Sequence, residues 1–194
     1  MRMIKKTYAL IIAVLLMLLS NFAFALHIKG VEIPERIMQE ASQQQLILNG
    51  AGLRSKFIFD IYVGALYLVQ RSDSAEQILA DASPKRIMMH FLYKKIEKEK
   101  MNSAWNEGFE ENLSEAQFRV LESKIETFNS AFGETLEGDV VVIDFLADST
   151  TRVTINKVEK ARIKGTDFQR ALLSVWLGES PVDGSLKRAM LGQQ

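Results

Sequence analysis

The run from Lys56 to Val69 constrains the fold more than any other feature of this chain. It is rich in β-branched and aromatic residues and has no proline, a composition typical of a β-strand. Because successive strand side chains point to opposite faces, alternate positions belong together. One face is almost wholly apolar: Phe57, Phe59, Ile61, Val63, Ala65 and Tyr67. The run predicts a long strand with this face on a core. Its other face, polar at its start, is expected to line a pocket or meet water.

Shorter patterns on both sides predict a sheet interrupted by helices. Further strands are expected at 27–33, 46–48, 87–93, 139–147, 151–157 and 160–164. Helices are expected at 74–83, 101–109, 114–132 and 166–177, with a short last helix near 186–190. The clearest helix carries one apolar stripe with spacings of three and four: Phe118, Leu121, Ile125, Phe128 and Phe132. Strands placed early and late, with helices between, predict an α+β fold with an antiparallel-rich sheet covered on one face by helices.

The first 25 residues have the order of a secretory signal peptide. A basic start and an apolar run over 8–19 precede the small-x-small pattern at 23–25 (Ala-Phe-Ala), so cleavage is expected after Ala25. A membrane anchor is the alternative, but a span needs about 20 apolar residues and this run is shorter. The domain at 26–194 is therefore expected in the periplasm or outside the cell, with no stable membrane span after cleavage.

The composition excludes several classes of protein. With 47% hydrophobic residues and 24 basic against 24 acidic side chains, the chain resembles neither a disordered protein nor a basic nucleic-acid binder. It has no cysteine, which excludes a disulfide framework and any cysteine-ligated metal site. HExxH motifs, Walker loops and complete dinucleotide fingerprints do not occur in the sequence. We therefore expect no metal, no cofactor and no nucleic-acid partner.

One polar residue is a candidate for ligand binding in a sequence that otherwise lacks functional motifs. Arg54 follows the glycine-rich residues 50–52, which we interpret as a bulge or bend where backbones approach closely. Its guanidinium suits a carboxylate or enolate oxygen, and Tyr62 adds a hydroxyl. The two share one site only if the chain turns between them, because eight extended residues cover roughly 26 Å. From the residues alone, a surface arginine, an interface tyrosine and a structural His90 are the favoured interpretation.

Longer stretches of the chain resemble the chalcone isomerase-like family. The first is Leu48–Phe57 (LNGAGLRSKF), continued by Tyr62–Leu68 (YVGALYL). The second is Ala171–Val182 (ALLSVWLGESPV), which is similar to the family's C-terminal helix and following turn. The order of the expected elements also agrees, so the resemblance covers nearly all of 26–194 and is closest to the bacterial exported branch. It implies an open-faced β-sandwich, a long antiparallel sheet with helices on one side.

The resemblance also implies roles for individual residues. In the family's plant enzymes an arginine polarises a chalcone for ring closure, and in its fatty-acid-binding relatives an arginine and a tyrosine hold a carboxylate. Arg54 and Tyr62 match these positions. His90 falls near the enzymes' catalytic lysine, and Asn106 near an asparagine of their cleft. The enzymes' water-ordering tyrosine would fall near Glu99, so the resemblance argues against chalcone cyclisation.

Three functions are consistent with these observations. The preferred one is an exported, non-catalytic binder of a small amphipathic acid such as a fatty acid, with Arg54 on the head group. The second is a cofactor-independent intramolecular lyase or isomerase in which Arg54 stabilises an oxyanion. The third is an interaction module whose cleft is filled by its own side chains. The sequence leaves the ligand and the oligomeric state open.

Overall fold

A seven-stranded antiparallel sheet forms the centre of the computed structural model, which describes residues 25–193. The strand order is β11-β10-β9-β6-β5-β4-β3. These strands are β3 (Arg36–Gln39), β4 (Gln44–Lys56), β5 (Phe59–Leu68), β6 (Lys85–Phe91), β9 (Val140–Phe145), β10 (Thr150–Ile155) and β11 (Val158–Lys164). Two small sheets pair β1 (Ala25–Ile28) with β2 (Val31–Pro34), and β7 (Lys95–Ile96) with β8 (Thr135–Leu136). The predicted signal peptide lies outside the described residues, except for Ala25.

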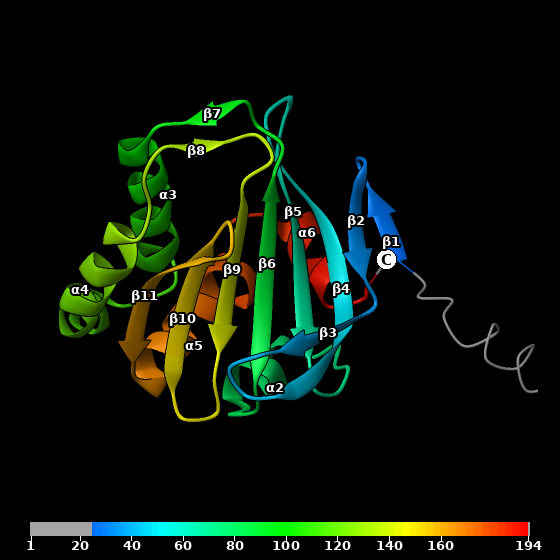
Figure 1. Ribbon diagram of the computed structural model, residues 1–194. Helices are drawn as coiled ribbons and strands as arrows, with labels where there is room; N and C mark the ends of the chain where they lie inside the picture. Colours follow the sequence, from blue (N-terminus) through cyan, green and yellow to red (C-terminus); the bar gives the residue numbers. More distant parts are fainter. Residues whose placement is uncertain (1–24, 194) are drawn as a thin grey trace, which may run out of the picture.

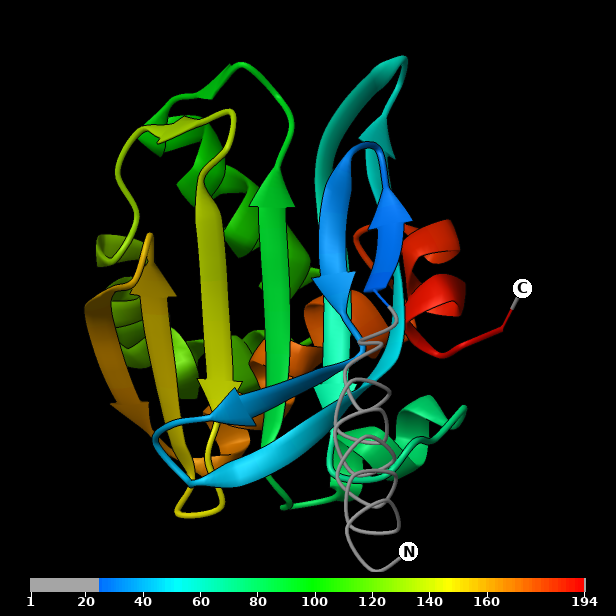
Figure 2. The same ribbon diagram turned by 45° about the vertical axis from the view of Figure 1, so that its right-hand side comes forward.

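The helices lie on one side of this sheet (Figures 1 and 2). They are α2 (Ala75–Ala80), α3 (Lys98–Glu110), α4 (Glu115–Ser130), α5 (Thr166–Leu177) and α6 (Gly184–Met190). The start of α4 shows why local sequence predicts these helices well. The Ser114 side chain accepts a hydrogen bond from the Gln117 backbone, and the Gln117 side chain accepts one from the Ser114 backbone. The arrangement confirms the α+β fold with an antiparallel sheet covered on one face by helices.

Strand β5 is buried on both faces, because apolar layers lie on each side of it. Leu66 and Leu68 belong to the main core with the helices. Val63, Ala65 and Tyr67 belong to a smaller cluster with residues of β2 and β4. The face predicted to be apolar is therefore buried from Ile61 onwards, but not at Phe57 and Phe59, which are exposed. The larger core lies mainly on the other face of the strand.

The predicted strand at 56–69 is wrong at its start, because a hairpin turn interrupts it. Lys56 pairs with Phe59, leaving Phe57 and Ile58 as a two-residue loop. Phe57 has a φ of 58°, whereas the φ of Ile58 is not positive. Positive φ at the first central residue alone is the pattern of a type II′ turn, where glycine is usual. The sequence lacks this signal, so the turn was not predicted.

The predicted strand at 27–33 is likewise two strands. Lys29 and Gly30, with φ of 51° and 80°, form the turn between β1 and β2. Two positive φ values are the pattern of a type I′ hairpin. The resulting hairpin lies beside β4 (Figure 2), and its residues Val31 and Ile33 supply part of the smaller apolar cluster.

The glycine-rich segment at 50–52 is the site of the predicted close approach of backbones, and the structure shows that the approaching element is the last helix. A Cβ on Gly50 would lie 2.0 Å from the Ala189 carbonyl oxygen, and one on Gly52 would lie 2.6 Å from the Ala189 Cβ. Asn49 reinforces the contact by donating a hydrogen bond to the Met190 carbonyl at 2.7 Å. Helix α6 is thereby held on β4, directly before Arg54.

A buried polar network lies on the opposite face of the sheet from the helices. Asp144 is fully buried and accepts hydrogen bonds from Arg86 Nε at 2.6 Å, Arg152 Nη2 at 2.7 Å and Gln39 Nε2 at 2.9 Å. Burial raises the pKa of the Asp144 carboxyl, but the bonds from Arg86, Arg152 and Gln39 outweigh it and hold that pKa below its usual range. The network ties β3, which crosses the end of the sheet, to β6, β9 and β10 (Figure 1).

Candidate ligand-binding site

A cavity of about 540 Å³ lies between the helix-covered face of the sheet and α3. Ligand pockets commonly measure roughly 300–1,000 Å³. Its walls are mostly apolar, and they include Ile61, Met89, Phe91, Met101, Trp105 and Val175. The protein's own side chains therefore leave a hollow here, which argues against the hypothesis of a closed cleft.

Arg54 and Tyr62 line this cavity together. They are directly paired across the β4–β5 hairpin, and the Arg54 guanidinium carbon lies 5.5 Å from the centroid of the Tyr62 ring. The turn at 57–58 brings them together, so the seven intervening residues do not separate them. A guanidinium at this distance from an aromatic ring is attracted by the ring's negative face. The stacking orients Arg54 along the wall of the cavity.

The Arg54 guanidinium has a buried donor that the described part of the protein leaves unpaired. Its Nε is buried and has no hydrogen-bond partner within residues 25–193. None of the ion pairs between described residues includes Arg54. A buried donor without an acceptor costs free energy that a bound anion would recover. Arg54 is thus not the fully exposed strand-end charge that the residues alone favoured.

The Tyr62 hydroxyl is a second polar group in the wall. Tyr62 is 4% exposed, and its hydroxyl accepts a hydrogen bond from Trp176 Nε1 at 2.9 Å. Burial raises the pKa of Tyr62, although the charge of Arg54 and the bond from Trp176 work in the opposite direction. The hydroxyl stays protonated, and its own hydrogen remains available to an acceptor in the cavity.

Trp105 supplies a third donor that the sequence did not reveal. Its Nε1 is buried without a hydrogen-bond partner in the described part of the chain, and the side chain lines the cavity. In the helix predicted at 101–109, Met101, Trp105 and Phe109 recur every four residues, a spacing that predicts one face packed on the core. All three are buried members of the main core, as predicted, and Met101 and Trp105 also border the cavity. No sequence signal separates these positions, because a core and a cavity wall demand the same helical spacing.

Comparison with known proteins agrees with this fold. The model of the family described as chalcone isomerase-like matches residues 25–192. The chain belongs to the chalcone isomerase-like family. No curated protein sequence matches it. The crystal structure of the Arabidopsis thaliana fatty-acid-binding protein AtFAP1 is similar with a TM-score of 0.66 at 15% identity, covering 87% of this chain and 96% of that chain. At this identity the likeness concerns the fold alone.

In this family member, the two stretches that carried the resemblance meet at the cavity. The first contributes Arg54 and Tyr62, and the second contributes Val175 and Val182. The bond from Trp176 to Tyr62 joins the two stretches directly. Segments more than a hundred residues apart in the sequence therefore build one wall.

The structure does not bring His90 or Asn106 to this wall. His90 lies on the other face of β6 from Met89 and Phe91, because side chains alternate along the strand. Asn106 turns from α3 towards α4, where its Oδ1 accepts a hydrogen bond from Asn129 Nδ2 at 2.7 Å. Matching by linear position alone could not detect these orientations.

Charged side chains of both signs surround the cavity. Lys56, Lys95, Glu99 and Lys100 contribute to its lining, and Lys95 forms an ion pair with Glu134. The lining contains no histidine. Within residues 25–193, no group of three His, Asp or Glu side chains is arranged to hold a metal ion. None of the described helices has the length and apolar character needed to cross a membrane.

Proposed function

We propose that this protein is an exported, non-catalytic binder of a small amphipathic acid, such as a fatty acid. The observation that carries the proposal is the buried, unpartnered Nε of Arg54 in the wall of an apolar cavity. The fold likeness to AtFAP1, a fatty-acid-binding protein, supports the same ligand class. The leader pattern in the first 25 residues supports the export part of the proposal.

The chemistry of the wall suits a carboxylate with an apolar tail. A carboxylate accepts several hydrogen bonds, and Arg54, Tyr62 and Trp105 each have a donor hydrogen that the protein leaves free. A hydrogen bond to a charged group contributes about 1.5–3 kcal/mol. Each buried methylene of the tail adds about 0.8 kcal/mol. Tail burial therefore supplies most of the affinity, and Arg54 selects for the acid.

Catalysis is the second candidate, because the same donors could stabilise an oxyanion. The cavity lining has no histidine, and it includes Glu99, near which the resemblance places the enzymes' water-ordering tyrosine. These features favour binding over isomerisation.

The test is displacement of a fluorescent fatty acid, cis-parinaric acid, from delipidated protein. Arg54→Ala should weaken binding of palmitic acid roughly 10- to 100-fold, because the carboxylate loses its charged partner. Arg162→Ala is the matched control, since Arg162 is exposed and paired with Glu159 on the surface. Methyl palmitate provides the ligand control, and its binding should be insensitive to Arg54→Ala.

Two outcomes would overturn the proposal. One is equal binding of the acid by the wild-type protein and Arg54→Ala. The other is turnover of a chalcone that Arg54→Ala abolishes, which would establish the isomerase instead.

A further inference from the structure

We propose that the tip of the β4–β5 hairpin docks on a lipid bilayer that contains anionic lipids. Phe57 and Ile58 form this tip and are 91% and 88% exposed. Figures 1 and 2 show the hairpin projecting beyond the rest of the sheet. Two adjacent large apolar side chains are thus presented to solvent on a protruding loop.

These two side chains do not serve the fold. Neither belongs to an apolar cluster of the interior. Phe57 also has a φ of 58°, a conformation that costs a bulky residue free energy and that glycine or asparagine adopts readily. A glycine or asparagine at this position would make the turn more stable. We therefore infer that the apolar side chains of the tip contact an external partner.

The size and shape of the tip favour a bilayer over a protein. Two side chains of this kind expose on the order of 300–400 Å². A stable protein interface buries roughly 800 Å² on each partner, with complementary shape. The hairpin tip offers about half of that area and is too small for an interface of this kind. Lipid acyl chains, in contrast, accept isolated apolar side chains without a preformed pocket.

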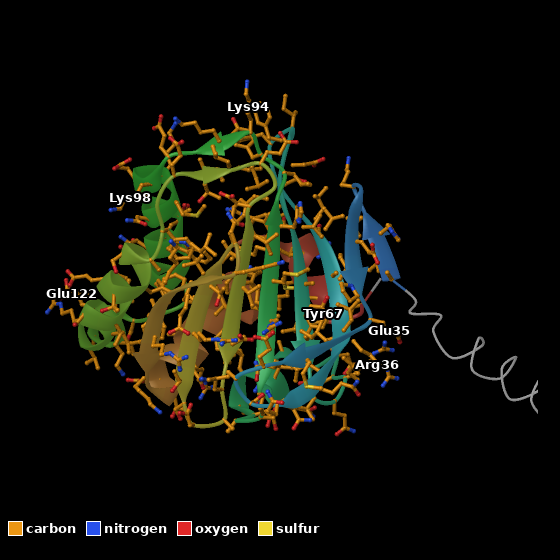
Figure 3. All side chains as sticks on the ribbon, viewed as in Figure 1. Glu35, Arg36, Tyr67, Lys94, Lys98 and Glu122 are labelled. Atoms are coloured by element: carbon orange, nitrogen blue, oxygen red, sulfur yellow. The ribbon has the colours of Figure 1, made fainter. Side chains whose placement is uncertain are left out.

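Lysines at the same end suit anionic head groups. Lys56 precedes the tip, and Lys94 lies at the end of the molecule where the hairpin projects (Figure 3). Neither forms an ion pair within residues 25–193, whereas Lys29 and Lys95 are paired with Asp60 and Glu134. Long lysine stems can lie along the membrane surface while the ammonium groups meet lipid phosphates.

The tip is continuous with the cavity. Lys56, Phe57 and Phe59 contribute to the cavity lining, and the Phe59 ring packs edge-on against Tyr93 with centroids 5.5 Å apart. A bilayer docked on the tip would therefore face the rim of the cavity. If the proposed acid ligand is correct, it could pass between membrane and cavity without crossing bulk water. The docking itself does not depend on the ligand.

Flotation with vesicles of equal parts phosphatidylglycerol and phosphatidylcholine tests the proposal. The chain is used as purified, and mass spectrometry verifies that all variants share one N-terminus. The double variant Phe57→Ser, Ile58→Ser should lower the partition coefficient at least about tenfold, because the inserted apolar surface is lost. Val120→Ser is the matched control, since Val120 is 77% exposed on α4, and it should bind like the wild-type protein.

A second readout reports the position of the tip directly. Ile58→Trp places an indole at the tip, and its fluorescence should be quenched by vesicles that carry brominated acyl chains. Trp105 and Trp176 are buried, and their fluorescence is subtracted by measuring the wild-type protein under the same conditions.

The outcomes separate the two proposals. Arg54→Ala should bind vesicles like the wild-type protein, whatever its effect on fatty-acid binding. The docking proposal is overturned if the wild-type protein does not float, if the double variant floats equally well, or if the indole at position 58 is not quenched. It is also overturned if light scattering shows that the tip instead joins two copies of the chain.

Discussion

Trp176 on α5 donates its indole hydrogen to the hydroxyl of Tyr62 on β5 at 2.9 Å. Both side chains are nearly completely buried, at 1% and 4% exposure. The bond connects the helix layer to the sheet beside the cavity, and it fixes the direction in which the Tyr62 hydroxyl points. The Arg54 guanidinium stacks on the ring of the same tyrosine. Tyr62 therefore positions two polar groups of the cavity wall, its own hydroxyl and the guanidinium of Arg54.

Tyr62→Phe should lower the free energy of unfolding by about 1–3 kcal/mol, because the buried Trp176 indole hydrogen loses its acceptor. Denaturant unfolding followed by circular dichroism measures the change. Tyr93→Phe serves as the control, since Tyr93 is half-buried and packs against Phe59 and the edge of the main core. Equal stability of Tyr62→Phe and the wild-type protein would show that the bond contributes nothing.

Trp105→Phe should separate ligand binding from stability. It keeps an aromatic ring against Phe128 but removes the unpartnered indole donor from the cavity. We expect affinity for palmitic acid to fall roughly two- to tenfold, the value of one neutral hydrogen bond, with a smaller loss of stability than in Trp176→Phe. Trp176→Phe is the comparison, because its indole is bonded and its loss should destabilise the fold. A large loss of stability in Trp105→Phe with unchanged affinity would assign Trp105 to the core alone.

Gly50→Ala should destabilise the protein by about 1–3 kcal/mol, because the new methyl group would overlap the Ala189 carbonyl and push α6 off the sheet. The matched control is Gly133→Ala, where no atom lies within 4 Å of the added carbon and φ is not positive. Thermal unfolding of the two variants gives the comparison. Similar melting temperatures for both would mean that α6 can shift without cost.

Asp144→Asn should lower the free energy of unfolding on the order of 3 kcal/mol at neutral pH, because Arg86 and Arg152 lose their buried countercharge. The exposed Asp148, paired with Lys164, provides the control, and Asp148→Asn should change stability much less. Chemical unfolding at several pH values measures both effects.

The pH dependence follows from the lowered pKa of Asp144. The native carboxyl binds its proton more weakly than the unfolded one, so its contribution to stability is complete above the ordinary value of 3.8. It is lost as the pH falls through the lower native pKa. The gap between the wild-type protein and Asp144→Asn should therefore be constant near neutrality and shrink below 3.8. A gap that widens in acid would contradict the assignment.

Local sequence determined the elements whose signals lie within a few residues of each other. The apolar stripe of α4 and the close approach at the glycine-rich residues 50–52 were predicted from such signals, and the capping box of Ser114 and Gln117 has the same short range. The α+β class followed from their order. The turn at Phe57 and Ile58 was missed because aromatic and β-branched residues normally mark a strand. Only pairing between β4 and β5 forces the chain to reverse there.

The site depended on relations that a linear pattern does not contain. The sequence alone singled out Arg54 for its charge and Tyr62 for its hydroxyl, but the hairpin decided that they face one another. Strand alternation turned His90 to the opposite face, and helix rotation turned Asn106 towards Asn129. Trp105 lines the cavity and keeps an unpartnered indole donor, a combination that its place on the helix stripe does not reveal. Spacing along the chain sets which side chains share a face, whereas the packing of distant elements determines which face meets a core, a hollow or water.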